Sequence, residues 1–134
     1  MAGPAEAWIV IVDDDPEMRS LVAFHLEKAG YQVTTCGDGW NAVVQTQGLN
    51  TGLVITDIKM PGGISGGDAV RALRSKPDVP KNLPVIFMSS LDADQAAKLI
   101  APIDPMMRFV QKPIDWVKLR QAIKDLTGVD RPLD

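Results

Sequence analysis

Five short apolar segments alternate along the chain with segments of helical periodicity, and this alternation limits the fold more than any other feature. The apolar segments are rich in β-branched or aromatic residues and are bounded by Gly, Pro or Asp, as buried strands are; they cover residues 8–12, 31–35, 53–57, 85–89 and 108–112. Helices are expected at about 16–29, 39–47, 68–75, 93–100 and 115–126. Strands and helices that alternate with short connections predict an α/β fold, a parallel sheet with helices on both faces.

The size and composition of the chain fit a single domain. It has 134 residues, of which 46% are hydrophobic, and no apolar run approaches the ~20 residues of a membrane-spanning helix, so we expect no membrane insertion. The N-terminus lacks the pattern of a secretory signal, and the single cysteine, Cys36, excludes an internal disulfide. These features predict a cytoplasmic location. A net charge of -3 without a basic stripe argues against direct nucleic-acid binding.

Polar side chains stand at the carboxyl ends of four of the predicted strands. Asp13 and Asp14 follow the first strand and Asp57 ends the third. Ser89 ends the fourth and Lys112 the fifth. In open parallel sheets, ligands bind beyond the carboxyl ends of the strands, where the strand order reverses. We therefore expect these five side chains to form one site.

The chemistry of this set favours a phosphoryl group. Clustered carboxylates repel one another, and either protons or a hard cation must relieve the repulsion. Mg²⁺ prefers oxygen ligands and is typically shared between one or two carboxylates and a phosphate. The Ser89 hydroxyl and the Lys112 ammonium add two donors for phosphoryl oxygens. The set therefore predicts a magnesium site at which a carboxylate attacks phosphorus to give an acyl phosphate.

Each of these residues also has a simpler interpretation. Residues 13–15 would serve as caps for the helix that follows, and Asp57 would be a turn residue. Ser89 would be a loop hydroxyl like Ser90, and Lys112 a solvated strand end. The coincidence of the residues at matching strand ends favours the functional interpretation.

Four motifs in this order resemble the receiver domain of two-component response regulators: IVDDDPEMR (11–19), ITDIKMP (55–61), VIFMSS (85–90) and FVQKPI (109–114). The resemblance runs from about Trp8 to Thr127. It implies a flavodoxin-like, doubly wound, five-stranded parallel sheet of order 2-1-3-4-5 with five helices. The implied receiver domain covers residues 6–128, with flexible termini at 1–5 and 129–134.

The resemblance also implies how the phosphoryl group arrives. Asp57 would be the phosphoacceptor and would attack a phosphohistidine on a sensor histidine kinase or a phosphotransfer protein. Asp13 and Asp14 would hold Mg²⁺ together with Asp57. The backbone carbonyl of Lys59 would be a further ligand.

The same resemblance implies a switch. Ser89 would turn toward the new phosphoryl group, Lys112 would bridge this group and the acceptor, and Phe109 would swing inward. The bond from Lys112 to Pro113 is expected to be cis. Phosphorylation adds about -1.5 to -2 charges at one point, which can select between two packings of a nearby surface.

The predicted function is a phosphorylation-dependent signalling switch and not a turnover enzyme. The expected surface for a downstream protein is the face built from the helix at 93–100, the strand at 108–112 and the helix at 115–126. Two alternatives stay open. A haloacid-dehalogenase-like phosphatase also uses an Asp nucleophile and Mg²⁺, and Asp13 and Asp15 have its spacing. The other alternative is a degenerate receiver that acts as a constitutive interaction module.

Two segments depart from the family pattern. The loop GGISGGDAV (62–70) is one residue longer and richer in glycine, so we expect a looser segment beside Asp57. The segment IAPIDPMMRF (100–109) contains two prolines and two methionines in place of the usual Gly-Ala-x-Asp run. We therefore expect a short helix at 93–100.

Overall fold

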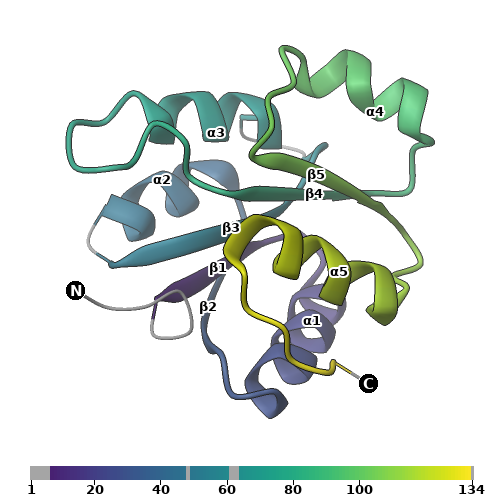
Figure 1. Cartoon of the computed structure of the whole chain (residues 1–134). Helices are drawn as coiled ribbons and strands as arrows, with labels where there is room; N and C mark the ends of the chain where they lie inside the picture. The colour runs from purple at the N-terminus through teal and green to yellow at the C-terminus, as the bar shows by residue number, and fades with distance from the viewer. Residues whose placement is uncertain (1–6, 48, 61–63, 134) are drawn as a thin grey trace.

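The computed structural model describes residues 7–47, 49–60 and 64–133, which form five strands and five helices in strict alternation (Figure 1). The elements are β1 (Trp8–Val12), α1 (Pro16–Lys28), β2 (Gln32–Cys36), α2 (Gly39–Gln47), β3 (Thr51–Asp57), α3 (Gly66–Arg74), β4 (Val85–Ser89), α4 (Ala93–Ile100), β5 (Met107–Gln111) and α5 (Trp116–Thr127). All ten predicted elements are present, with ends shifted by two residues at most. The predicted α/β fold is confirmed.

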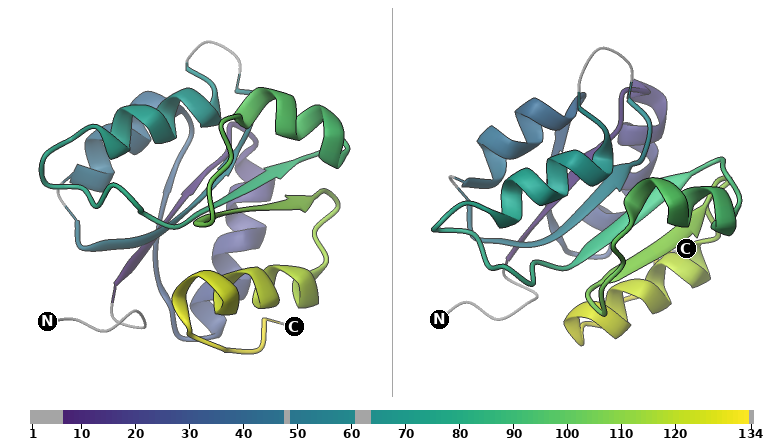
Figure 2. Two further views of the ribbon diagram at one scale, coloured as in Figure 1. Left: turned by 45° about the horizontal axis from the view of Figure 1, so that its top comes forward. Right: turned by 90° about the horizontal axis from the view of Figure 1, so that it is seen from above.

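The strands form one parallel sheet of order β2-β1-β3-β4-β5, as expected. The direction of strand order reverses between β1 and β3, which places the topological switch point at their carboxyl ends. Helices α2, α3 and α4 cover one face of the sheet, and α1 and α5 cover the other (Figures 1 and 2).

Strand β1 shows why both faces of the sheet are apolar. Val10 and Val12 pack into the core beneath α2 and α3, whereas Ile9 and Ile11 pack into the core beneath α1 and α5. Alternate residues of a strand point to opposite faces, so a strand buried on both sides is apolar at every position. A parallel sheet with two helical layers therefore accounts for the run at residues 8–12.

Of the three consecutive aspartates at residues 13–15, one caps helix α1. Asp15 is the N-cap, since its side chain accepts a hydrogen bond of 3.0 Å from the backbone N–H of Glu17, and Pro16 occupies the first helical turn. The capping interpretation is therefore confirmed for Asp15. Asp13 and Asp14 remain at the end of β1 for another role.

Residues 129–133, for which we expected flexibility, lie against α1 and α5 (Figure 1). Leu133 is buried, and its carbonyl oxygen is hydrogen-bonded to Nδ1 of His25. The His25 ring stacks on Trp116 of α5 at 3.7 Å between centroids, and Arg131 lies 5.0 Å above the ring of Tyr31. The C-terminal segment thus joins the two helices on this face.

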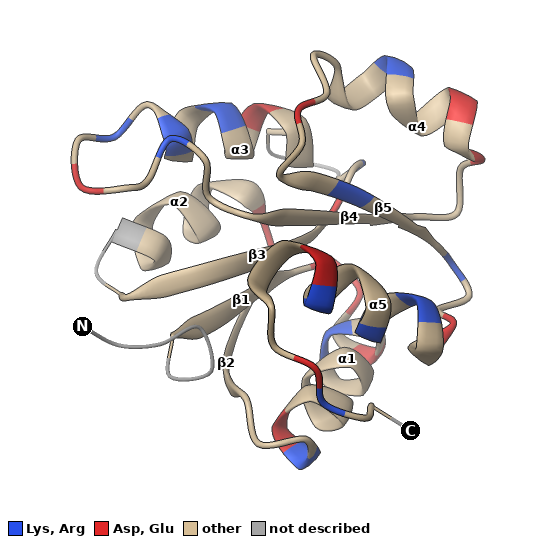
Figure 3. Ribbon diagram, viewed as in Figure 1, with Lys and Arg blue, Asp and Glu red and all other residues tan. Residues whose placement is uncertain are grey.

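Other expectations fall outside the described residues or concern the surface. Residues 1–5, and residues 62 and 63 of the glycine-rich loop, are outside the described ranges. The described part of the chain contains no helix of the length and apolarity needed to cross a lipid bilayer. Basic and acidic residues share helices α3, α4 and α5 (Figure 3).

Candidate functional site

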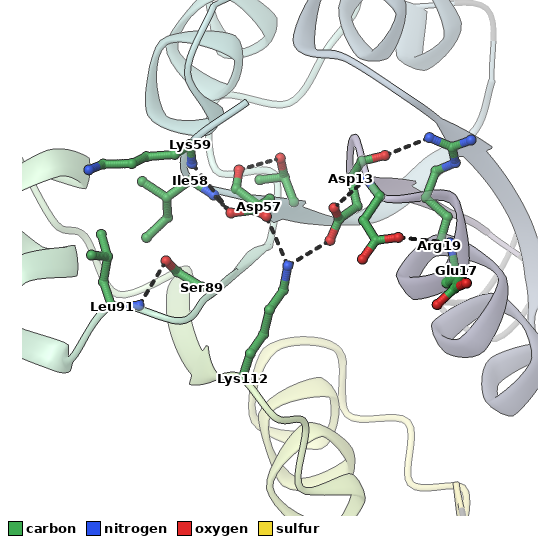
Figure 4. Close-up of polar contacts among 11 residues, drawn as sticks. Asp13, Glu17, Arg19, Asp57, Ile58, Lys59, Ser89, Leu91 and Lys112 are labelled. Carbon is green, nitrogen blue, oxygen red and sulfur yellow. Dashed lines mark hydrogen bonds and ion pairs between the residues drawn. The ribbon is translucent and has the colours of Figure 1, made fainter. Parts of the chain in front are cut away.

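The carboxyl ends of β1 and β3 bring three carboxylates together. Val12 is in register with Thr56, so Asp13, directly after β1, lies beside Asp57, the last residue of β3. One carboxylate oxygen from each of Asp13, Asp14 and Asp57 lies within 4.8 Å of the others. The structure thus places the three predicted acids in one cluster at the switch point. Figure 4 shows two of them, Asp13 and Asp57.

Lys112 approaches this cluster from the end of β5. Its Nζ donates hydrogen bonds of 2.9 Å to Oδ2 of Asp13 and to Oδ2 of Asp57 (Figure 4). Lys112 is the residue after β5, not its last member, and its backbone N–H donates to the Ser89 carbonyl oxygen. The bond to Pro113 is cis, as expected. Lys112 therefore connects the carboxyl ends of β1 and β3 through its two hydrogen bonds.

The charge state of Lys112 depends on two opposing effects. Burial alone lowers the pKa of its ammonium, but hydrogen bonds and charges from Asp57 and Asp13 outweigh burial and raise the pKa above its ordinary value. Because folding raises this pKa, the ion pairs contribute fully to stability at pH values below the pKa of a lysine in the unfolded chain. Their contribution is lost only as the pH rises through the raised value. Lys112 is therefore a cation at neutral pH.

Asp13 and Asp14 differ in their surroundings although they are adjacent. Asp13 is fully buried; its Oδ1 accepts from the Asp15 N–H at 2.9 Å and its Oδ2 from Lys112. Asp14 is exposed, and within the described residues its carboxylate has no hydrogen-bond partner. Asp14 is thus the acid whose oxygens are most available to a ligand from solvent.

Asp57 is held by backbone donors and by one cation. Its Oδ1 accepts from the N–H of Ile58 at 2.6 Å and from the N–H of Lys59 at 3.3 Å, and its Oδ2 accepts from Lys112. Only 9% of the residue is exposed. The carboxylate is therefore oriented in advance, with access from one side.

Ser89 is the last residue of β4, and Phe109 lies in the middle of β5. Ser89 is buried and its Oγ accepts from the Leu91 N–H at 3.1 Å, whereas Ser90 is exposed. Phe109 is half-buried and packs against the core beneath α3 and α4. The positions fit the predicted roles of Ser89 and Phe109, which stay predictions.

Sequence reasoning missed two residues that shape this site. Arg19 of α1 donates a hydrogen bond of 2.8 Å from Nη1 to the carbonyl oxygen of Asp13. Gly66 opens α3 directly against β3, and a Cβ at Gly66 would lie 2.1 Å from the carbonyl oxygen of Asp57. In the sequence, Arg19 is one arginine of a helical segment, and no pattern links it to the Asp13 carbonyl. Nothing in the sequence marked Gly66 among its glycine neighbours.

The contact of Gly66 with Asp57 gives a testable prediction. Gly66→Ala should lower the free energy of unfolding by about 1–3 kcal/mol, because the added Cβ forces α3 away from the acceptor strand. Urea titration measures the loss. Gly67→Ala is the matched control: its Cβ would meet the Leu99 carbonyl oxygen at 3.2 Å, so a smaller loss is expected. Equal stability of Gly66→Ala and the wild type would refute the close contact.

Comparison with known proteins decides the family. The family model for the response regulator receiver domain matches residues 9–124. This chain belongs to the response regulator receiver family. The receiver domain is 34% identical over 126 residues to the probable transcriptional regulatory protein TcrX of Mycobacterium tuberculosis, covering 90% of this chain and 51% of TcrX. It is 33% identical over 112 residues to the CAI-1 autoinducer sensor kinase/phosphatase CqsS of Vibrio cholerae, covering 82% of this chain and 16% of CqsS.

Solved structures agree with this assignment. The chemotaxis protein CheY4 of Vibrio cholerae superposes with a TM-score of 0.78 at 26% identity, covering 91% of this receiver domain and 99% of CheY4. The signal receiver domain of a histidine kinase from Syntrophus aciditrophicus gives a TM-score of 0.77 at 29% identity, covering 92% of each chain. The receiver domain thus matches other receivers along their whole length but spans about half, or less, of TcrX and CqsS.

The acidic cluster of the receiver domain fits a divalent cation. Three carboxylates with oxygens within 4.8 Å of one another are hard donors of the type that Mg²⁺ prefers. Lys112 neutralises one charge of the three, which leaves the cluster net negative. The donor set therefore suits Mg²⁺, which would be held by Asp13, Asp14 and Asp57.

Proposed function

We propose that Asp57 of this receiver domain accepts a phosphoryl group from a phosphohistidine and thereby changes partner binding. The observation that carries the proposal is the cluster of Asp13, Asp14 and Asp57 with Lys112 bridging two of its members. An Asp57 oxygen forms the new bond to phosphorus. The bond from phosphorus to the imidazole nitrogen breaks, and the electron pair stays with the leaving imidazole.

Each neighbouring group has a part in this transfer. Bound Mg²⁺ supplies a charge that lowers the repulsion between Asp57 and the incoming phosphoryl oxygens. Asp13 and Asp14 would hold the cation, with the backbone carbonyl of Lys59 as a proposed further ligand. Lys112 pairs with Asp57 at 2.9 Å and is placed to pair with the phosphoryl group after transfer. The chain would thus act once per phosphoryl group, as a switch.

The proposed output surface is the face of α4, β5 and α5. A groove of about 110 Å³ lies between α4 and β5, and Phe109 contributes to its wall along with Ala96 and Ile100. The Ser89 hydroxyl lies at the end of the neighbouring β4 and would turn toward the phosphoryl group. Inward movement of Phe109 would then reshape the groove that a downstream protein contacts.

The partners follow from the same chemistry. A sensor histidine kinase or a phosphotransfer protein would supply the phosphoryl group, and a protein, not nucleic acid, would bind the output face. We also propose that the receiver domain extends from residue 6 to residue 128 and that the protein is cytoplasmic.

Incubation with acetyl phosphate and MgCl₂ tests the function. We expect an intact-mass increase of one phosphoryl group per chain, and its absence when EDTA removes the metal. A haloacid-dehalogenase-like phosphatase would instead release phosphate over many turnovers. A degenerate receiver would take up no label from acetyl phosphate or from any kinase. Either of these two results would contradict the proposal.

Leu91 is expected to limit the access of water to the acyl phosphate. The residue is half-buried, and its N–H donates to the Ser89 hydroxyl oxygen beside the acceptor. Leu91→Asn should therefore shorten the lifetime of the phosphoryl group several-fold, because a polar side chain can orient an attacking water. Loss of label after removal of acetyl phosphate measures the lifetime. An unchanged decay rate would remove this role.

A further inference from the structure

Arg19 of α1 holds the backbone that joins the two adjacent acids of the metal site. Its Nη1 donates a hydrogen bond of 2.8 Å to the carbonyl oxygen of Asp13, and Figure 4 shows the guanidinium reaching this carbonyl from α1. The carbonyl is part of the peptide group between Asp13 and Asp14. Because a peptide group is planar, holding its oxygen also restrains the direction in which Asp14 leaves it.

Asp14 depends on this restraint more than Asp13 does. The Asp13 carboxylate is held by Asp15 and Lys112, and its N–H donates to the Cys36 carbonyl oxygen at 3.1 Å. The Asp14 carboxylate is exposed and has no hydrogen-bond partner in the described parts of the chain. Before a cation binds, the backbone therefore sets the direction of the Asp14 Cα–Cβ bond, and no hydrogen bond in the described residues holds the carboxylate itself.

We propose that Arg19 is a positioning residue that aims the Asp14 carboxylate at the divalent cation. The inference rests on the proposed function, because it concerns the same acidic site. Arg19 does not itself contact the cation, since its guanidinium is positively charged and is bound to the backbone. Its effect passes through the peptide group between Asp13 and Asp14.

Gly37 provides the space that this arrangement needs. It follows β2, the sheet neighbour of β1, and a Cβ at this position would lie 3.0 Å from Nη1 of Arg19. The backbone of Gly37 does not have a positive φ, so alanine is tolerated there. Gly37→Ala thus displaces the guanidinium by a few tenths of an ångström without removing any charge.

The sign of the effect separates positioning from simple electrostatics. Removal of a positive charge near a cation site strengthens cation binding if only Coulomb repulsion between the two cations matters. Loss of a restraint on Asp14 instead weakens cation binding, because binding must then also overcome the entropy cost of ordering this side chain. Arg19→Gln removes both the charge and the hydrogen bond, whereas Gly37→Ala disturbs the hydrogen bond alone.

Titration of MgCl₂ in a calorimeter tests the inference on the whole chain. We expect Arg19→Gln to weaken Mg²⁺ binding about fivefold and Gly37→Ala about twofold, since a charged hydrogen bond to a carbonyl is lost or strained. Lys28→Gln is the charge-matched control: Lys28 is exposed in the last turn of α1 and should leave the affinity unchanged. Acetyl phosphate labelling of Arg19→Gln should be slow at low Mg²⁺ and recover at high Mg²⁺.

The outcomes are distinguishable. Unchanged or tighter Mg²⁺ binding by Arg19→Gln, or labelling that equals the wild type at every Mg²⁺ concentration, would overturn the role of Arg19. If Arg19→Gln does not fold, judged by circular dichroism in EDTA, the affinity of Gly37→Ala decides in the same way. If the wild type binds no Mg²⁺, the proposed function fails instead.

Discussion

Asp57→Asn should abolish phosphoryl uptake from acetyl phosphate completely, whereas the wild type takes up one group per chain. An amide is a poor nucleophile, and no other carboxylate combines the partial exposure, the two backbone donors and the Lys112 contact that the structure describes for Asp57. Intact-mass spectrometry in MgCl₂ measures the result. The substitution nearly preserves shape, so the protein should remain folded.

Asp94→Asn is the matched control for this loss. Asp94 is an exposed carboxylate in the first turn of α4, away from the cluster, and its variant should label like the wild type. Label that persists on Asp57→Asn would move the acceptor to another residue. Asp13 would then be the first candidate, as the phosphatase alternative requires.

Lys112→Met should cost about 3 kcal/mol of the free energy of unfolding in EDTA, because it leaves a fully buried Asp13 beside Asp57 without the shared ammonium. Added Mg²⁺ should restore part of the loss by supplying positive charge to the same oxygens. Urea titrations with EDTA or MgCl₂ measure these effects.

Two further variants test whether the cost comes from the lost ion pair between Lys112 and Asp13. Lys118→Met removes an exposed cation from α5 and should change stability little. In the double variant Asp13→Asn/Lys112→Met, the partner charge is also absent, so the added cost of losing Lys112 should fall. A Lys112→Met protein as stable as the wild type in EDTA would show that the bridge does not hold the strand ends together.

The sequence predicted the three central strands well because β1, β3 and β4 are apolar on both faces. The edge strands β2 and β5 are only partly buried, and their β-branched or aromatic residues between Gly, Pro or Asp indicated them instead. The sequence also predicted that Asp13, Asp14, Asp57 and Lys112 come together, because polar residues that follow apolar runs are easily recognised as strand ends.

Helix α3 was expected to begin at about Asp68, after two glycines, a residue type that disfavours helix. In the structure it begins at Gly66, where the approach of the Asp57 backbone leaves no room for a Cβ. A tertiary contact, invisible in the sequence, overrides the local preference.

The features that sequence analysis missed depend on residues far apart in the chain. Leu133 follows no periodic pattern, and its burial requires the meeting of His25 and Trp116 from two helices. Arg19 looks like any arginine on a helix until the turn after β1 presents the Asp13 carbonyl to it. The spacing of residues in the sequence thus indicates which side chains lie at the ends of neighbouring strands. It does not show which other side chains hold them in position.

Crystals soaked with MnCl₂ would show directly whether the acidic cluster binds a divalent cation. Mn²⁺ accepts the same oxygen ligands as Mg²⁺ and gives an anomalous signal. We predict one anomalous peak among the carboxylates of Asp13, Asp14 and Asp57. A well-ordered site without a peak, or a peak bound elsewhere while these carboxylates stay empty, would contradict it.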